Sequence, residues 1–259
     1  MAFTSERDDG RDIYLMKPDG SGVRRLTDDP GEDAQPAWSP DRSKIAFASN
    51  RDGNFEIYVM NADGTRPSRL THAPGDDGFP AWSPDGTKIA FAGDRTGNGE
   101  IYVMNADGTG VKQLTNQTDD DLAPAWSPDG TRIAFDRDRG ELNFDILVMN
   151  PDGTDVKPLA ASPAGDLSPG WSPDERKIVF QSDRTDTFHI YLMNEDGTGV
   201  KQLTSDAADD SLPSWSPDGT KVAFVRDSGG NPEIFVMDAD GGNVRQLTHD
   251  PAEDIDPAW

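Results

Sequence analysis

The sequence contains no cysteine and only three histidines. The lack of cysteine excludes disulfide bonds and thiolate metal sites, but it does not assign a compartment. No apolar run is long enough to span a bilayer. Neither a G-x-S-x-G nor an H-E-x-x-H motif occurs, and a glycine-rich phosphate loop is also missing. We therefore assign no catalytic residue and expect a protein that is not an enzyme.

Basic residues are scarce, with 24 Lys and Arg against 48 Asp and Glu, which gives a net charge of −24. Such an acidic surface repels phosphate backbones and anionic headgroups. We therefore expect neither a nucleic-acid partner nor membrane insertion. The charge favours a cation or a basic partner, although the need for solubility explains it equally well.

The sequence repeats a short string with the pattern P-A-W-S-P-D at intervals of 44 or 45 residues, and these copies contain all 6 tryptophans. The copies begin at Pro36, Pro80, Pro124, Pro169, Pro213 and Pro257. A fixed period of this size is typical of repeat architectures, in which a single repeat cannot bury its own faces. We therefore expect one domain over residues 1–259.

Each repeat predicts four short antiparallel strands, as at 33–38, 44–48, 56–60 and, one repeat later, 111–115. The second strand alternates large and small residues, which indicates a sheet covered on both faces. Four strands per repeat are typical of a β-propeller blade. We predict an all-β fold, a six-bladed propeller of four-stranded antiparallel blades.

The C-terminal strand is expected to complete the N-terminal blade and so close the ring. The first blade then comprises residues 1–27 plus 254–259, and the others start near 33, 77, 121, 166 and 210. We expect a monomer, although exchange of the last strand between copies would give an oligomer. Because the sequence starts inside a repeat, we also expect a piece of a longer protein.

The strings W-S-P-D-G, I-A-F, E-I-Y-V-M-N-x-D-G-T and Q-L-T recur through the chain. They resemble the WD-like β-propeller repeat of the TolB family over the whole sequence. The resemblance implies a six-bladed propeller, a periplasmic or secreted location, and a peptide or protein segment bound at the channel mouth. In the same family this blade also serves peptidase gating domains and oligogalacturonate lyases, so the fold does not select one function.

One aspartate lies five residues before each tryptophan, where the chain enters the innermost strand of a blade. These residues are Asp33, Asp77, Asp121, Asp166, Asp210 and Asp254. Converging carboxylates repel one another and either take up protons or recruit a cation, and the oxygen donors suit Ca²⁺ best. The alternative is that each aspartate caps local backbone amides once per blade. No cofactor is required by the sequence, and Ca²⁺ in the central channel is the metal we expect if one binds.

Other residues near these aspartates differ from blade to blade, which is where a ligand would be recognised. The candidate partner-binding residues are Gln35, Phe79, Leu122, Leu167, Leu212 and Ile255. The preferred hypothesis is a non-enzymatic binding or scaffold propeller. The alternatives are a metal-assisted lyase or hydrolase at the acidic mouth, and a trimmed or engineered repeat protein with no ligand.

Overall fold

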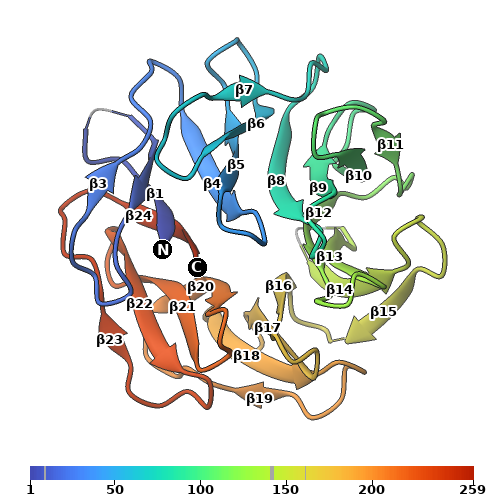
Figure 1. Ribbon diagram of the computed structural model, residues 1–259. Coiled ribbons are helices and arrows are strands. Elements are labelled where there is room, and N and C mark those ends of the chain that lie inside the picture. The colour runs from blue at the N-terminus through green and yellow to red at the C-terminus, as the bar shows by residue number, and fades with distance from the viewer. Residues whose placement is uncertain (9, 141–142, 161) are drawn as a thin grey trace.

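The computed structural model describes residues 1–8, 10–140, 143–160 and 162–259, and it forms a ring of six four-stranded antiparallel sheets around a central channel (Figure 1). Blade 1 contains β24 (Asp254–Ala258), β1 (Ala2–Ser5), β2 (Asp12–Leu15) and β3 (Arg24–Arg25). Blade 2 contains β4 (Asp33–Trp38), β5 (Lys44–Ser49), β6 (Glu56–Asn61) and β7 (Ser68–Arg69). Blade 3 contains β8 (Asp77–Trp82), β9 (Lys88–Gly93), β10 (Glu100–Asn105) and β11 (Lys112–Gln113).

The other three blades repeat this order. Blade 4 contains β12 (Asp121–Trp126), β13 (Ile133–Asp138), β14 (Phe144–Met149) and β15 (Lys157–Ala160). Blade 5 contains β16 (Asp166–Trp171), β17 (Lys177–Ser182), β18 (His189–Asn194) and β19 (Lys201–Gln202). Blade 6 contains β20 (Asp209–Trp215), β21 (Lys221–Asp227), β22 (Pro232–Asp238) and β23 (Arg245–Gln246).

The predicted ring closure is confirmed, because β24 pairs with β1 and the two termini lie side by side (Figure 1). The sheet formed by both ends of the chain leaves no open edge on the innermost side of blade 1. Closure removes the unpaired N–H and C=O groups that an open array of sheets would expose.

The hydrophobic core lies between neighbouring blades. In one cluster Ala2 and Ile13 of blade 1 pack against Ile45, Phe47 and Tyr58 of blade 2. The larger residues of the second strand therefore face the smaller residues of the preceding blade, as the alternating pattern predicted. The same arrangement recurs around the ring, and the second-strand phenylalanines are fully buried.

Each innermost strand is interrupted by a β-bulge just before its proline. In β4 the pairing shifts between Ala34 and Ala37. The bulge residue has a φ between 47° and 57° in every blade, a region that L-residues with side chains rarely adopt. The six bulge residues are Gln35, Phe79, Ala123, Ser168, Leu212 and Asp256. All of them line the channel, so the bulge is the local feature that presents one side chain per blade to the lumen.

The propeller has two unlike faces. The mouth face carries the starts of the innermost strands and the loops between the second and third strands. The far face carries the S-P-D turns after the tryptophans and the turns between the third and fourth strands. Because strand directions alternate, every blade presents the same segments to the same face. Among the described residues no helix is long and apolar enough to cross a membrane.

Candidate functional site

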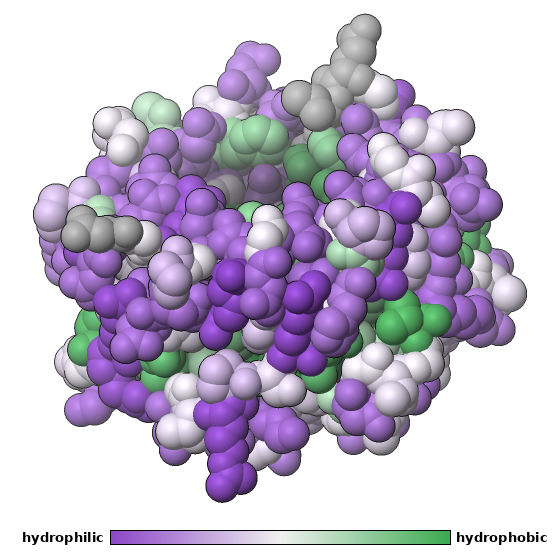
Figure 2. Space-filling view, turned by 90° about the horizontal axis from the view of Figure 1, so that it is seen from above, coloured by the Kyte–Doolittle hydropathy of each residue, from purple (hydrophilic) through white to green (hydrophobic). Residues whose placement is uncertain are grey.

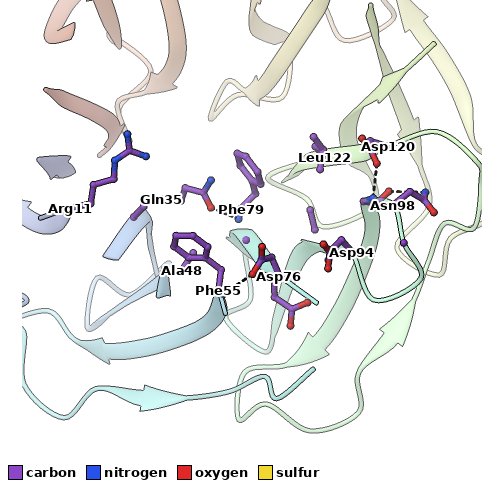
Figure 3. A pocket seen from close by; sticks show the side chains of 17 residues that line it. Arg11, Gln35, Ala48, Phe55, Asp76, Phe79, Asp94, Asn98, Asp120 and Leu122 are labelled. Atoms are coloured by element: carbon purple, nitrogen blue, oxygen red, sulfur yellow. Dashed lines mark hydrogen bonds between the residues drawn. The ribbon is translucent and has the colours of Figure 1, made fainter. Parts of the chain in front are cut away.

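A cavity of about 470 Å³ opens on the mouth face over blades 2, 3 and 4. Figure 3 shows Phe79 and Leu122 beside this space, with Phe55 and Asp76 on one side and Asp94, Asn98 and Asp120 on another. The apolar side chains Phe55, Phe79 and Leu122 are all partly exposed. The surface is largely hydrophilic, and Figure 2 shows apolar groups within a hollow at the top of the view.

The cavity exists because blade 3 carries unusually small residues at this end. Gly99 lies two residues before the third-strand isoleucine, where blades 2, 4 and 5 have phenylalanine, at Phe55, Phe144 and Phe188. A Cβ atom on Gly99 would lie 2.8 Å from Leu122 Cδ2. The second strand contributes Ala92, whose equivalent in blade 5 is Gln181. These small residues leave a hollow beside blade 3, and the blades depart from sixfold symmetry there.

Carboxylates at the rim of the cavity are held in place by loop backbone. Asp76 accepts a hydrogen bond from the Phe55 amide at 2.8 Å, and Asp120 accepts one from the Gly99 amide at 2.7 Å. Asp94 is exposed beside them. The cation that lines the cavity is Arg11, and it is already paired with Glu6 at 2.7 Å. The rim therefore has a negative charge and few groups to neutralise it.

A second cavity of about 360 Å³ continues through the channel, lined by the bulge residues and the prolines that follow them. Side chains of the preceding blade hold several bulge amides. Gln35 Oε1 accepts from the Phe79 amide at 2.7 Å, and Gln181 Oε1 accepts from the Leu212 amide at 2.8 Å. In blade 4 a carboxylate holds the bulge amide of the next blade, because Asp136 Oδ2 accepts a hydrogen bond from the Ser168 amide at 2.9 Å.

Asp136 is a fully enclosed carboxyl in this channel wall, 2% exposed. Its Oδ1 atom is buried without a hydrogen-bond partner among the described residues. Desolvation raises the pKa of Asp136 to about 7, and the nearby charge of Asp121 acts in the same direction. Blades 2 and 3 have alanine at this position, at Ala48 and Ala92, so the buried carboxyl is particular to blade 4.

The six predicted metal ligands are each paired with an arginine. Asp77, for example, accepts hydrogen bonds from Arg95 at 3.0 and 2.6 Å, and its side chain is fully buried. Burial raises the pKa of Asp77, while the Arg95 charge acts against that shift. The equivalent pairs are Asp33–Arg51, Asp121–Arg137, Asp166–Arg184, Asp210–Arg226 and Asp254–Arg7.

An arginine therefore lies beside each of the six carboxylates, and cation binding by these aspartates stays a prediction. Among the described residues, no group of three or more His, Asp or Glu side chains is placed to hold a metal ion. Each guanidinium also lies over the ring of its second-strand phenylalanine, as Arg95 does over Phe91. In five of the blades it lies over a third-strand aromatic ring as well, which is Tyr102 for Arg95. Calcium in the central channel likewise stays a prediction.

The arginine reaches its aspartate from two different backbone positions. Blades 1, 2, 3 and 5 use a loop arginine, as Arg51 in blade 2. Blades 4 and 6 use an arginine two residues earlier on the second strand, Arg137 and Arg226. The loop position in blade 4 is Arg139, which pairs with Asp145 instead. The guanidinium site is thus a requirement of every blade, which identifies these pairs as part of the scaffold.

The predicted partner-binding residues differ in which cavity they line. Gln35 and Phe79 line both cavities, Leu122 lines the mouth cavity, and Leu212 lines the channel. Leu167 and Ile255 are partly buried and line neither of the two. In their blades the channel residues are the next ones along the chain, Ser168 and Asp256. The position immediately before each proline would have identified these residues from the sequence.

A closed ring of six repeat-built blades around a central channel defines a six-bladed β-propeller of the tandem-repeat class. The chain belongs to the TolB beta propeller domain family, whose profile matches residues 1–77, 70–158, 122–208 and 167–259. No curated protein sequence matches the chain significantly.

Several solved structures share the fold. TolB from Acinetobacter baumannii is 25% identical with a TM-score of 0.86, and the match covers 100% of this chain but 65% of that protein. A putative TolB from Agrobacterium tumefaciens is 27% identical with a TM-score of 0.80, covering 96% and 89% of the two chains. An oligogalacturonate lyase in complex with manganese is 17% identical with a TM-score of 0.63, covering 96% and 72%, and shows likeness of fold alone.

Proposed function

We propose that this chain is a non-enzymatic binding module that holds a segment of a protein or peptide at the mouth of its channel. The observation that carries the proposal is the cavity of about 470 Å³ on blades 2–4, which has the apolar side chains Phe55, Phe79 and Leu122 in its lining. Concave sites with an apolar lining and a few polar groups are the usual form of a binding site. The similarity to TolB structures supports a binding role over a catalytic one.

The alternative of a metal-assisted lyase or hydrolase receives no support from the side chains. The three histidines lie in different parts of the ring, at His72, His189 and His249. The described residues contain no grouped donor set that would bind a catalytic metal.

A peptide array tests the proposal. Overlapping segments of candidate partner proteins are bound to a surface and probed with the wild-type chain and with Gly99→Phe. The substitution places in blade 3 the side chain that blades 2, 4 and 5 carry at the same position, so the fold should accept it while the cavity is filled. We expect segments that bind the wild type and fail to bind the variant.

The matched control is Val200→Phe, which adds an aromatic ring to an exposed residue of the far face. This variant should bind the same segments as the wild type. If Gly99→Phe retained the wild-type binding pattern, the mouth cavity would not be the binding site and the proposal would be wrong.

A further inference from the structure

The charges of this propeller are distributed unequally between its two faces. All eight lysines of the sequence lie on the far face, at the start of a second or fourth strand or in a turn between the third and fourth strands. They are Lys17, Lys44, Lys88, Lys112, Lys157, Lys177, Lys201 and Lys221. The net charge of −24 is therefore concentrated toward the mouth, where lysine is absent.

The arginines of the mouth face do not offset this charge at the surface. Arg7, Arg51 and Arg95 each pair with a fully buried aspartate, and Arg11 pairs with Glu6 and Glu253. The rim carboxylates Asp76, Asp94 and Asp120 lie outside these pairs and line the cavity. Their field extends over about 8 Å at physiological salt, which covers the cavity entrance.

We propose that the mouth cavity takes a large apolar side chain from an extended partner segment while a neighbouring lysine or arginine of that segment lies against Asp76, Asp94 and Asp120. This inference rests on the proposed binding function and specifies the chemistry of the partner. The apolar residues Phe55, Phe79 and Leu122 provide the contact for the first group. The carboxylates are oriented in advance, since the Phe55 and Gly99 amides hold two of them.

The one-sided charge also selects the direction of approach. A cationic segment is attracted to the mouth and gains nothing from the lysine-bearing far face, so encounters are steered to the cavity. An acidic segment of the same shape would be repelled at the rim. Specificity then comes as much from rejecting acidic partners as from attracting basic ones.

Random peptides displayed on phage, selected against the immobilised wild-type chain, test this inference. We expect the selected peptides to combine net positive charge with an aromatic or large aliphatic residue. Synthetic copies should bind about tenfold more weakly when NaCl is raised from about 50 mM to about 500 mM. The triple variant Asp76→Asn, Asp94→Asn, Asp120→Asn should weaken binding by about tenfold, because three rim charges each contribute a modest amount.

The matched control removes the same charge from the far face with Asp155→Asn, Glu195→Gln and Asp240→Asn, and its affinity should stay within about twofold of the wild type. Some peptides could bind the wild type, fail to bind Gly99→Phe, and bind the triple variant as tightly as the wild type. That result would overturn this inference, but the proposed binding function would stand. Selected peptides that are neutral or acidic would do the same. Failure to select any peptide that Gly99→Phe excludes would overturn both.

Discussion

Replacing Asp136 by asparagine should change how the stability of the propeller depends on pH. The carboxyl is enclosed in the channel wall, its Oδ1 has no partner among the residues that the structure describes, and its pKa is raised from 3.8 to about 7. The folded chain therefore holds this proton more tightly than the unfolded chain does. Its contribution to stability is complete below about pH 4 and is lost as the pH rises through about 7.

The size of the effect follows from the pKa difference. A difference of about three units corresponds to about 4 kcal/mol, because each unit is worth about 1.4 kcal/mol. Asparagine keeps an oxygen for the Ser168 amide and cannot ionise. It introduces a buried amide with a cost of about 1 kcal/mol at all pH values. We therefore expect Asp136→Asn to be about as stable as the wild type near pH 4.5 and more stable by a few kcal/mol at pH 8.

Urea unfolding of both proteins between pH 4.5 and 8, followed by tryptophan fluorescence, measures this difference. Asp28→Asn is the matched control, since it removes the same charge from an exposed position. Its stability should follow the wild type across the range. Parallel curves for the wild type and Asp136→Asn would show that Asp136 ionises normally in the folded chain, and the reasoning from its burial would be refuted.

Three further perturbations test the scaffold. Asp77→Ala leaves the Arg95 guanidinium without its partner, and urea unfolding should show a loss of about 3 kcal/mol. Trp82→Phe removes an indole hydrogen bond to the Ala37 carbonyl and should cost about 1 kcal/mol more than Trp126→Phe, since the Trp126 indole N–H is buried without a partner among the described residues. Deleting residues 254–259 exposes the edge of β1, and sedimentation should then show association or loss of the compact monomer.

The fold could be predicted from the sequence because its signals repeat. The spacing of the tryptophans gave the number of blades, and alternating residues such as Ile45 and Phe47 gave the buried faces. Closure followed from the position of the last repeat, since Asp254 begins a strand that has no later partners in the chain. These inferences needed only the repeat spacing and the strand pattern. Both can be read from the sequence without knowing which distant residues are in contact.

The site was harder to predict, because repetition marks scaffold and function alike. Asp33 and its equivalents looked like a ring of ligands, although each was the fixed partner of an arginine. In blade 4 the arginine that pairs with the aspartate lies two residues earlier in the sequence, at Arg137 rather than at Arg139. The cavity arises because blade 3 has a glycine, Gly99, where three other blades have a phenylalanine. Such a difference is visible only when the blades are superposed in space.

The pairing of β24 with β1 joins the first residues of the chain to the last. Blades 2 to 6 are each built from one continuous stretch of sequence, whereas blade 1 needs strands from both ends of residues 1–259. When the propeller refolds from a denatured state, we therefore expect blades 2 to 6 to form from local contacts and blade 1 to close last, because β24 and β1 meet across the longest separation in the ring.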